Sequence, residues 1–63
     1  MPIIHVNMVE GKTLEQKRKL ATNMTEAVVR SLDVPPDHVR IVIHELPKTN
    51  FATAGVLISD KKE

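Results

Sequence analysis

A long amphipathic helix with clear start and stop signals lies between two segments rich in β-branched residues. Thr13 and Gln16 fit a capping box, in which each side chain accepts a hydrogen bond from the other residue's backbone N–H. The helix must end at Asp33-Val34-Pro35-Pro36, because proline disfavours helical geometry in the residue before it. Between these signals, apolar residues recur at helical spacing and form one stripe. The stripe consists of Leu20, Ala21, Met24, Ala27, Val28 and Leu32.

The two flanking segments, 3–9 and 38–46, are predicted to be strands. In each of them apolar residues alternate with other residues, and β-branched residues are frequent. Gly11 breaks the first strand, because glycine readily adopts a positive φ. A helical crossover of this length favours a parallel strand pair with a right-handed connection.

The rest of the chain predicts only short elements. Residues 47–50 indicate a loop, residues 51–58 a short hairpin or strand around Gly55, and residues 59–63 a polar tail. The sequence shows no repeat, low-complexity segment or linker. We therefore expect a single α+β domain over residues 1–63.

Composition excludes several functions. The net charge of +1 provides no broad field for nucleic acid or an anionic membrane, and Phe51 is the single aromatic residue. The sequence has no cysteine, and its amino-terminal residues do not resemble a signal peptide. No apolar run approaches the roughly 20 residues that span a bilayer. We expect a soluble cytoplasmic protein with no nucleic-acid or membrane partner.

Size points to self-association. A chain of 63 residues buries only about 60% of the surface that its unfolded form exposes. Small proteins compensate with disulfides, a metal or oligomerisation. Cysteine is absent, and the three histidines lack the spacing of a three-ligand zinc site, although two of them could meet across neighbouring strands. We expect no metal or other cofactor, and a homo-oligomer in which another copy covers the exposed apolar faces.

Pro2 is the most informative candidate for catalysis. If the initiator methionine is removed, Pro2 presents a secondary amine at the start of the chain. A partly desolvated amine near cationic groups has its charged form disfavoured and can act as a base near neutral pH. The ordinary alternative is that the chain begins Met-Pro by chance.

Five motifs follow one another from Pro2 to about Ser59: PIIHVNMVEGK, T-x-E-Q-K-x-x-L, S-L-D-V-P, V-R-I-V-I-x-E and N-F-A-T-A-G. In this order they resemble the 4-oxalocrotonate tautomerase family of short subunits. The resemblance implies a β-α-β tautomerase fold, a homohexamer built as a trimer of dimers, and no cofactor. It also implies keto–enol tautomerisation of 2-hydroxymuconate-like dienol carboxylates, in aromatic hydrocarbon catabolism.

The same resemblance implies roles for four residues. Pro2 matches the family's general base and acid, and Arg40 matches the arginine that binds the substrate's carboxylate and carbonyl. Phe51 matches the phenylalanine that makes the pocket apolar. Lys12 stands where the best-characterised members have an arginine for a distal carboxylate, and lysine lacks the planar fork of arginine.

Two alternatives remain open. The Lys12 substitution leaves room for a phenylenolpyruvate-type or other enol tautomerase. A non-catalytic oligomer that binds a small ligand or partner would tolerate a retained Met1, which converts the Pro2 nitrogen into an amide. The state of this amine separates the catalytic and the non-catalytic interpretations.

Overall fold

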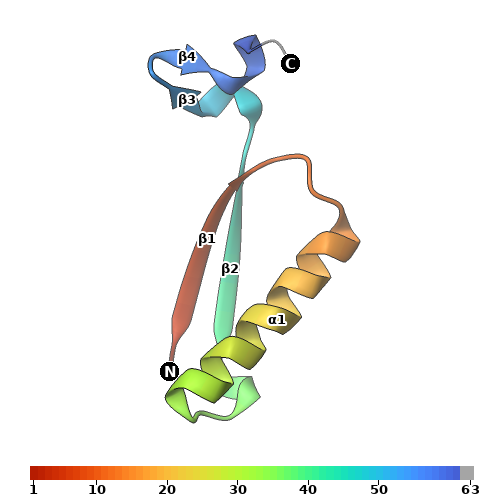
Figure 1. Ribbon diagram of the computed structural model, residues 1–63, viewed down its shortest axis with the longest axis vertical. Helices are drawn as coiled ribbons and strands as arrows, with labels where there is room; N and C mark the ends of the chain where they lie inside the picture. Colours follow the sequence, from red (N-terminus) through yellow and green to blue (C-terminus); the bar gives the residue numbers. More distant parts are fainter. Residues whose placement is uncertain (62–63) are drawn as a thin grey trace.

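The protein is a β-α-β unit followed by a small hairpin (Figure 1). The computed structural model describes residues 1–61. In chain order the elements are β1 (Ile3–Val9), α1 (Leu14–Leu32), the 3₁₀ turn η1 (Pro36–His38), β2 (Arg40–Leu46), η2 (Lys48–Asn50), β3 (Ala52–Thr53), β4 (Val56–Leu57) and η3 (Ile58–Asp60). β1 and β2 are parallel, with a register that runs from Ile3 opposite Arg40 to Val9 opposite Leu46. The predicted α+β class and the parallel pair are confirmed.

Both ends of α1 are determined locally. The Thr13 backbone N–H donates to Gln16 Oε1 at 2.8 Å, and the Gln16 N–H donates to Thr13 Oγ1 at 3.1 Å, so the predicted capping box is present. At the other end, Asp33 adopts a left-handed conformation with φ of 55°. Its N–H donates to the Val29 carbonyl at 3.0 Å, which closes the helix ahead of the two prolines.

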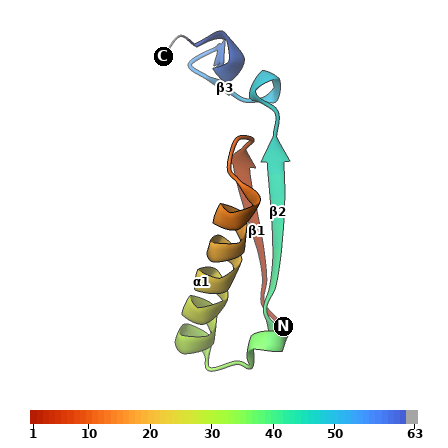
Figure 2. The ribbon, with the colours of Figure 1, turned by 90° about the vertical axis from the view of Figure 1, so that its right-hand side faces the viewer.

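α1 lies along one face of the two-stranded sheet and leaves the other face free (Figure 2). Ile4 and Val6 on β1 and Ile41 and Ile43 on β2 alternate with more exposed neighbours, in phase with one another. An ion pair between the Lys17 ammonium and the Glu45 carboxylate joins α1 to β2. The sheet and the helix therefore form two layers.

The free face of the sheet carries apolar side chains. Ile3 is 59% exposed and Val42 is 39% exposed. Leu14 and Leu32, at the two ends of α1, are also exposed. These residues indicate surfaces that a single chain does not cover.

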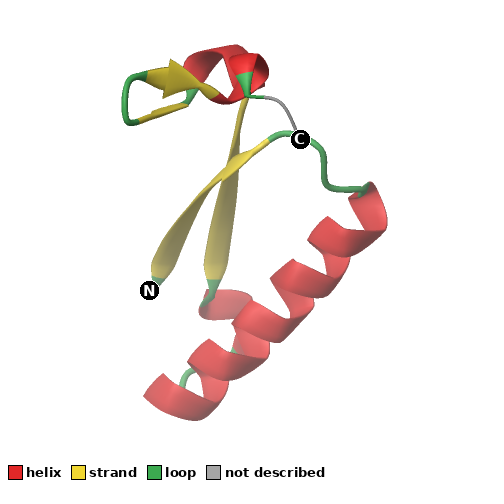
Figure 3. Ribbon diagram, turned by 45° about the horizontal axis from the view of Figure 1, so that its top comes forward, coloured by secondary structure: helices red, strands yellow, loops and turns green. Residues whose placement is uncertain are grey.

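The carboxyl-terminal segment forms a hairpin that lies beyond the end of β2 (Figure 3). Ala54 and Gly55 both have positive φ, at 53° and 81°, which is the geometry of a two-residue type I′ turn between antiparallel strands. The Ile58 N–H donates to the Phe51 carbonyl at 2.8 Å and closes the base of the hairpin. Of the two possibilities predicted for residues 51–58, the hairpin is the one observed.

Two boundaries differ from the prediction. The second strand begins at Arg40 instead of residue 38, because Pro36–His38 form a 3₁₀ turn that the Val39 N–H closes on the Pro36 carbonyl. His38 therefore lies outside the sheet. The predicted loop at 47–50 contains the 3₁₀ turn η2, and the predicted polar tail begins within η3, while residues 62 and 63 lie outside the described residues.

Within its described part, a single chain has no buried interior. Among residues 1–61 no side chain is classed as buried, and Ala27 and Leu32 of the predicted apolar stripe are exposed. The radius of gyration is 14.9 Å, whereas a compact chain of this length has about 11 Å. The fold accordingly needs further surface to cover its apolar faces.

None of the helices in residues 1–61 combines the length and the apolar character needed to cross a membrane.

Candidate active site

Pro2 and Arg40 lie at the same end of the strand pair. The backbone N–H of Arg40 donates to the carbonyl oxygen of Pro2 at 3.0 Å, one residue beyond the Ile3–Arg40 pair. Pro2 is half-buried and Arg40 is exposed. The hydrogen bonds between β1 and β2 thus hold the backbone of the candidate base, Pro2, beside the backbone of the candidate anion-binding residue, Arg40.

The Arg40 side chain is anchored by the turn that precedes its strand. Its Nη1 donates to the carbonyl oxygen of Asp37 at 3.0 Å. This bond uses one of the five N–H donors of the guanidinium. The remaining donors stay available for a planar, bidentate contact with a carboxylate or a carboxylate–carbonyl pair.

The state of the Pro2 nitrogen depends on Met1. With Met1 attached, this nitrogen is a tertiary amide without a basic lone pair, and Met1 itself is 71% exposed. Removal of Met1 turns the same atom into a secondary amine at the end of β1.

Lys12 follows β1 and Phe51 follows η2. The segments after β1 and β2 lie at the end of the strand pair opposite to the chain's N-terminus (Figure 1). Lys12 is exposed in the turn after β1, and Phe51 follows η2 with 40% of its surface exposed. β1 lies between these residues and Pro2, and it spans about 20 Å from Ile3 to Val9 at about 3.3 Å per residue. One chain therefore does not bring the four candidate residues into one site.

Glu10 forms hydrogen bonds that link the turn leading to Lys12 with the segment leading to Phe51. Its N–H donates to the Leu46 carbonyl at 2.9 Å, and its Oε2 accepts from the Lys48 N–H at 3.0 Å. The turn after β1 and the turn after β2 are thus held together. The sequence analysis did not identify this role, which depends on the register of β1 and β2.

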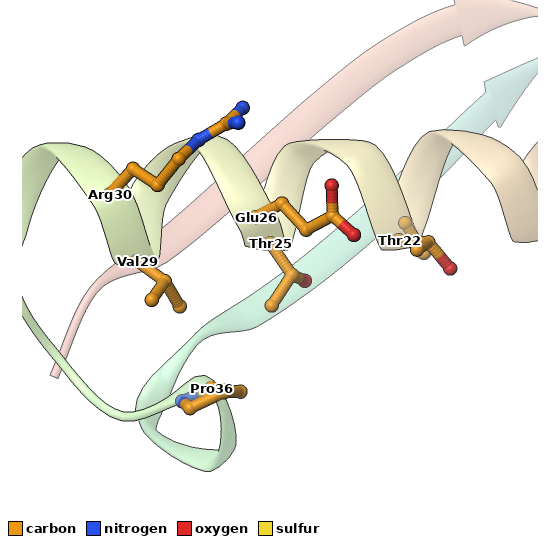
Figure 4. A pocket seen from close by; sticks show the side chains of 7 residues that line it. Thr22, Thr25, Glu26, Val29, Arg30 and Pro36 are labelled. Carbon is orange, nitrogen blue, oxygen red and sulfur yellow. The ribbon is translucent and has the colours of Figure 1, made fainter.

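A surface hollow of about 520 Å³ lies away from these residues, between the carboxyl-terminal half of α1 and η1. In Figure 4, the side chains of Val29 and Thr25 point to the side of the helix on which Pro36 lies, whereas Arg30 extends to the other side. The hollow has no residue in common with the candidate site. Its wide opening and its mixed lining of apolar, threonine and charged residues are typical of an uncovered helix face.

The histidines and carboxylates of the described residues form no cluster of three. Residues 1–61 contain no group of three or more His, Cys, Asp or Glu side chains arranged to hold a metal ion. Two of the three histidines, His5 and His44, do meet across β1 and β2. His38, in η1, is not part of this pair.

Solved structures define the class of the fold. A structure from a study of 4-oxalocrotonate tautomerase isozymes of Methylibium petroleiphilum is 53% identical, covers 92% of this chain and 91% of its own, and has a TM-score of 0.88. A heterohexamer 4-oxalocrotonate tautomerase of Chloroflexus aurantiacus is 32% identical, with a TM-score of 0.91 over 98% of this chain and 100% of its own. The chain has the tautomerase fold.

Comparison of the sequence with known proteins identifies the family to which the chain belongs. The profile described as "Tautomerase enzyme" matches residues 2–61. The 2-hydroxymuconate tautomerase of Stutzerimonas stutzeri is 44% identical over 55 residues, which are 87% of each chain. This chain belongs to the tautomerase family, and its activity class is that of a tautomerase, an isomerase. The predicted resemblance is confirmed.

Proposed function

We propose that the protein converts 2-hydroxymuconate-like dienols to their 2-keto tautomers without a cofactor, with Pro2 as the general base and acid after removal of Met1. The observation that carries this proposal is the position of Pro2 and Arg40 at one end of the β1–β2 ladder, joined by a 3.0 Å backbone hydrogen bond. Membership of the tautomerase family supports the reaction class.

The reaction moves one proton from one position of the substrate to another. The free amine of Pro2 accepts the proton of the 2-hydroxyl group, and the conjugated electrons shift to form the 2-keto carbonyl. The protonated amine then returns the proton to a carbon at the other end of the conjugated system. The product has the same atoms as the substrate, so the reaction needs no oxidant, reductant or water.

Arg40 binds the carboxylate and the 2-oxygen of the substrate. Its guanidinium presents parallel N–H donors that suit two oxygens in one plane. These hydrogen bonds strengthen as negative charge develops on the 2-oxygen, so they stabilise the transition state more than the ground state. The bond from Nη1 to the Asp37 carbonyl supports the orientation of the guanidinium.

Phe51 and Lys12 complete the site from other copies of the chain. The separation of about 20 Å along β1 supports this arrangement, because neither side chain spans such a distance. Phe51 excludes water and keeps the amine uncharged, and Lys12 attracts a distal carboxylate. The assembly that we propose is a homohexamer built as a trimer of dimers, consistent with the lack of buried side chains among residues 1–61 of one chain.

Lys12 widens the range of substrates. An ammonium binds a carboxylate as a point charge without a fixed geometry. Enols without a second carboxylate, such as phenylenolpyruvate, therefore lose less binding than they would opposite an arginine.

We place the enzyme in the cytoplasm, in the degradation of aromatic compounds through catechol cleavage.

The test is the ketonisation of 2-hydroxymuconate, followed by ultraviolet absorbance. The protein is first shown by mass spectrometry to lack Met1. Rapid turnover that is lost in Pro2→Ala supports the proposal, because alanine keeps a free primary amine but lacks the ring. Absence of turnover for dienol and monocarboxylate enols, with a free Pro2, would reject it in favour of a non-catalytic binding protein.

A further inference from the structure

Two histidines meet on the sheet face that α1 leaves free. His5 Nδ1 lies 3.1 Å from His44 Nε2, and the two rings are nearly parallel, with an angle of 14° between their planes and 5.3 Å between their centroids. Both side chains are exposed, and they come from neighbouring strands. The proposed tautomerase mechanism uses neither residue.

We propose that His5 and His44 form a chelating site for a late first-row divalent cation such as Zn²⁺, Ni²⁺ or Cu²⁺. Histidine nitrogens bind such ions at about 2.0–2.1 Å. Two nitrogens on one ion, at tetragonal or tetrahedral angles, are then about 2.8–3.4 Å apart. The observed 3.1 Å separation lies within this interval. The facing nitrogens point at one another, so each ring must turn about its side-chain bonds until its lone pair points to the ion.

Binding of the cation requires a tautomer shift in one of the two rings. In the hydrogen-bonded pair, one of the two facing nitrogens carries hydrogen. When the ion binds, that hydrogen moves to the far nitrogen of the same ring, and both facing nitrogens present lone pairs. The hydrogen stays on the ring that carried it, so binding to two neutral rings releases no proton overall.

The strands position both ligands before the ion arrives. In the parallel register, His5 lies opposite Val42 and His44 lies opposite Asn7, so the two histidines are diagonal neighbours on one face of the sheet. No residue of α1 has to move, because the helix lies on the other face (Figure 2). Water takes the remaining coordination positions.

The site has a definite chemical preference. Imidazole ligands favour late transition metals, whereas Mg²⁺ and Ca²⁺ require oxygen ligands. The neighbouring positions Val42 and Asn7 supply no carboxylate. We therefore expect Cu²⁺ to bind more tightly than Ni²⁺ or Zn²⁺, and Mg²⁺ to leave the site empty.

The experiment is a calorimetric titration of untagged protein with Zn²⁺ at neutral pH, with Mg²⁺ as a second titrant. We expect saturation at one Zn²⁺ per chain. His5→Gln and His44→Gln should each weaken Zn²⁺ binding by about an order of magnitude or more, because a single imidazole remains. His38→Gln is the matched control, since His38 lies outside the pair and its loss should leave binding unchanged.

A second measurement does not depend on the folding of variants. Imidazole nitrogen resonances of the unmodified protein should shift on Zn²⁺ addition at His5 and His44 but not at His38. Unsaturable Zn²⁺ uptake, equal weakening by His38→Gln, or shifts absent from either paired ring would overturn the proposal. Tautomerase activity is a separate readout, so failure of the metal site leaves the proposed function intact.

Discussion

The Arg40 backbone N–H donates to the Pro2 carbonyl oxygen at 3.0 Å, which extends the parallel ladder by one residue toward the chain's beginning. The hydrogen bond holds Pro2 at the end of the sheet, although it precedes β1. The candidate base Pro2 and the candidate anion-binding residue Arg40 are 38 positions apart in the sequence, and this bond holds them at the same end of the strand pair.

Removal of the Pro2 ring should abolish most of the activity. We expect Pro2→Ala to lower kcat for 2-hydroxymuconate by about 10²–10⁴, the usual contribution of general acid–base catalysis. Protein that keeps Met1 should be equally slow, because its Pro2 nitrogen is an amide. Ultraviolet kinetics on samples of known mass measure both effects, and full activity with Met1 in place would contradict this role of Pro2.

Loss of the Arg40 guanidinium should weaken transition-state binding. We expect Arg40→Ala to lower kcat/KM by about 10-fold to 150-fold, since hydrogen bonds to charged groups contribute about 1.5–3 kcal/mol. Arg40→Lys should recover part of this loss, because the charge remains without the fork. Arg18→Ala, on the exposed surface of α1, is the control and should behave as wild type.

Lys12 should matter for substrates with a second carboxylate. We expect Lys12→Ala to raise KM for 2-hydroxymuconate by up to about tenfold and to leave KM for phenylenolpyruvate nearly unchanged. Lys12→Arg should lower KM for the dicarboxylate, because a guanidinium binds both carboxylate oxygens. Lys19→Ala, exposed on α1, controls for general charge effects. Equal changes for the two substrates would show that Lys12 does not contact the distal carboxylate.

Mixed oligomers should show whether Pro2 and Phe51 of one site come from different copies of the chain. Pro2→Ala and Phe51→Ala chains, each impaired alone, are unfolded together and refolded. If Pro2 and Phe51 of one site belong to different copies, some mixed sites contain both native residues, and activity should exceed the sum of the parents. Mass spectrometry confirms the mixing. Activity no higher than that sum would place both residues of a site in one chain.

The capping box should contribute measurable stability. Thr13→Ala removes the acceptor for the Gln16 N–H, and we expect a loss of about 1 kcal/mol per chain in the free energy of unfolding. Thr13→Ser keeps the acceptor and should retain most of that stability. Urea denaturation at a fixed chain concentration measures the difference, since assembly makes stability depend on concentration. Equal midpoints for the alanine and serine variants would contradict the capping role.

Much of the fold could be predicted because its signals are local. The Thr13–Gln16 box and the Pro35-Pro36 pair define the helix through contacts within a few residues. Alternation identified both strands, and the helical crossover favoured their parallel arrangement. His38 was wrongly assigned to the second strand. The alternation of apolar and other residues continues back to His38, so the sequence pattern does not reveal the 3₁₀ turn at Pro36–His38.

The type and order of the elements, the expectation of self-association and the chemical types of the candidate residues could be inferred before the structure was known. Each of these follows from short-range preference, from apolar spacing or from motif resemblance. The contacts between distant residues became visible in the folded chain: the Pro2 carbonyl with Arg40, Glu10 with the backbone of Lys48, and His5 with His44. These contacts depend on the β1–β2 register, and a shift of one residue would turn every side chain of a strand to the opposite face.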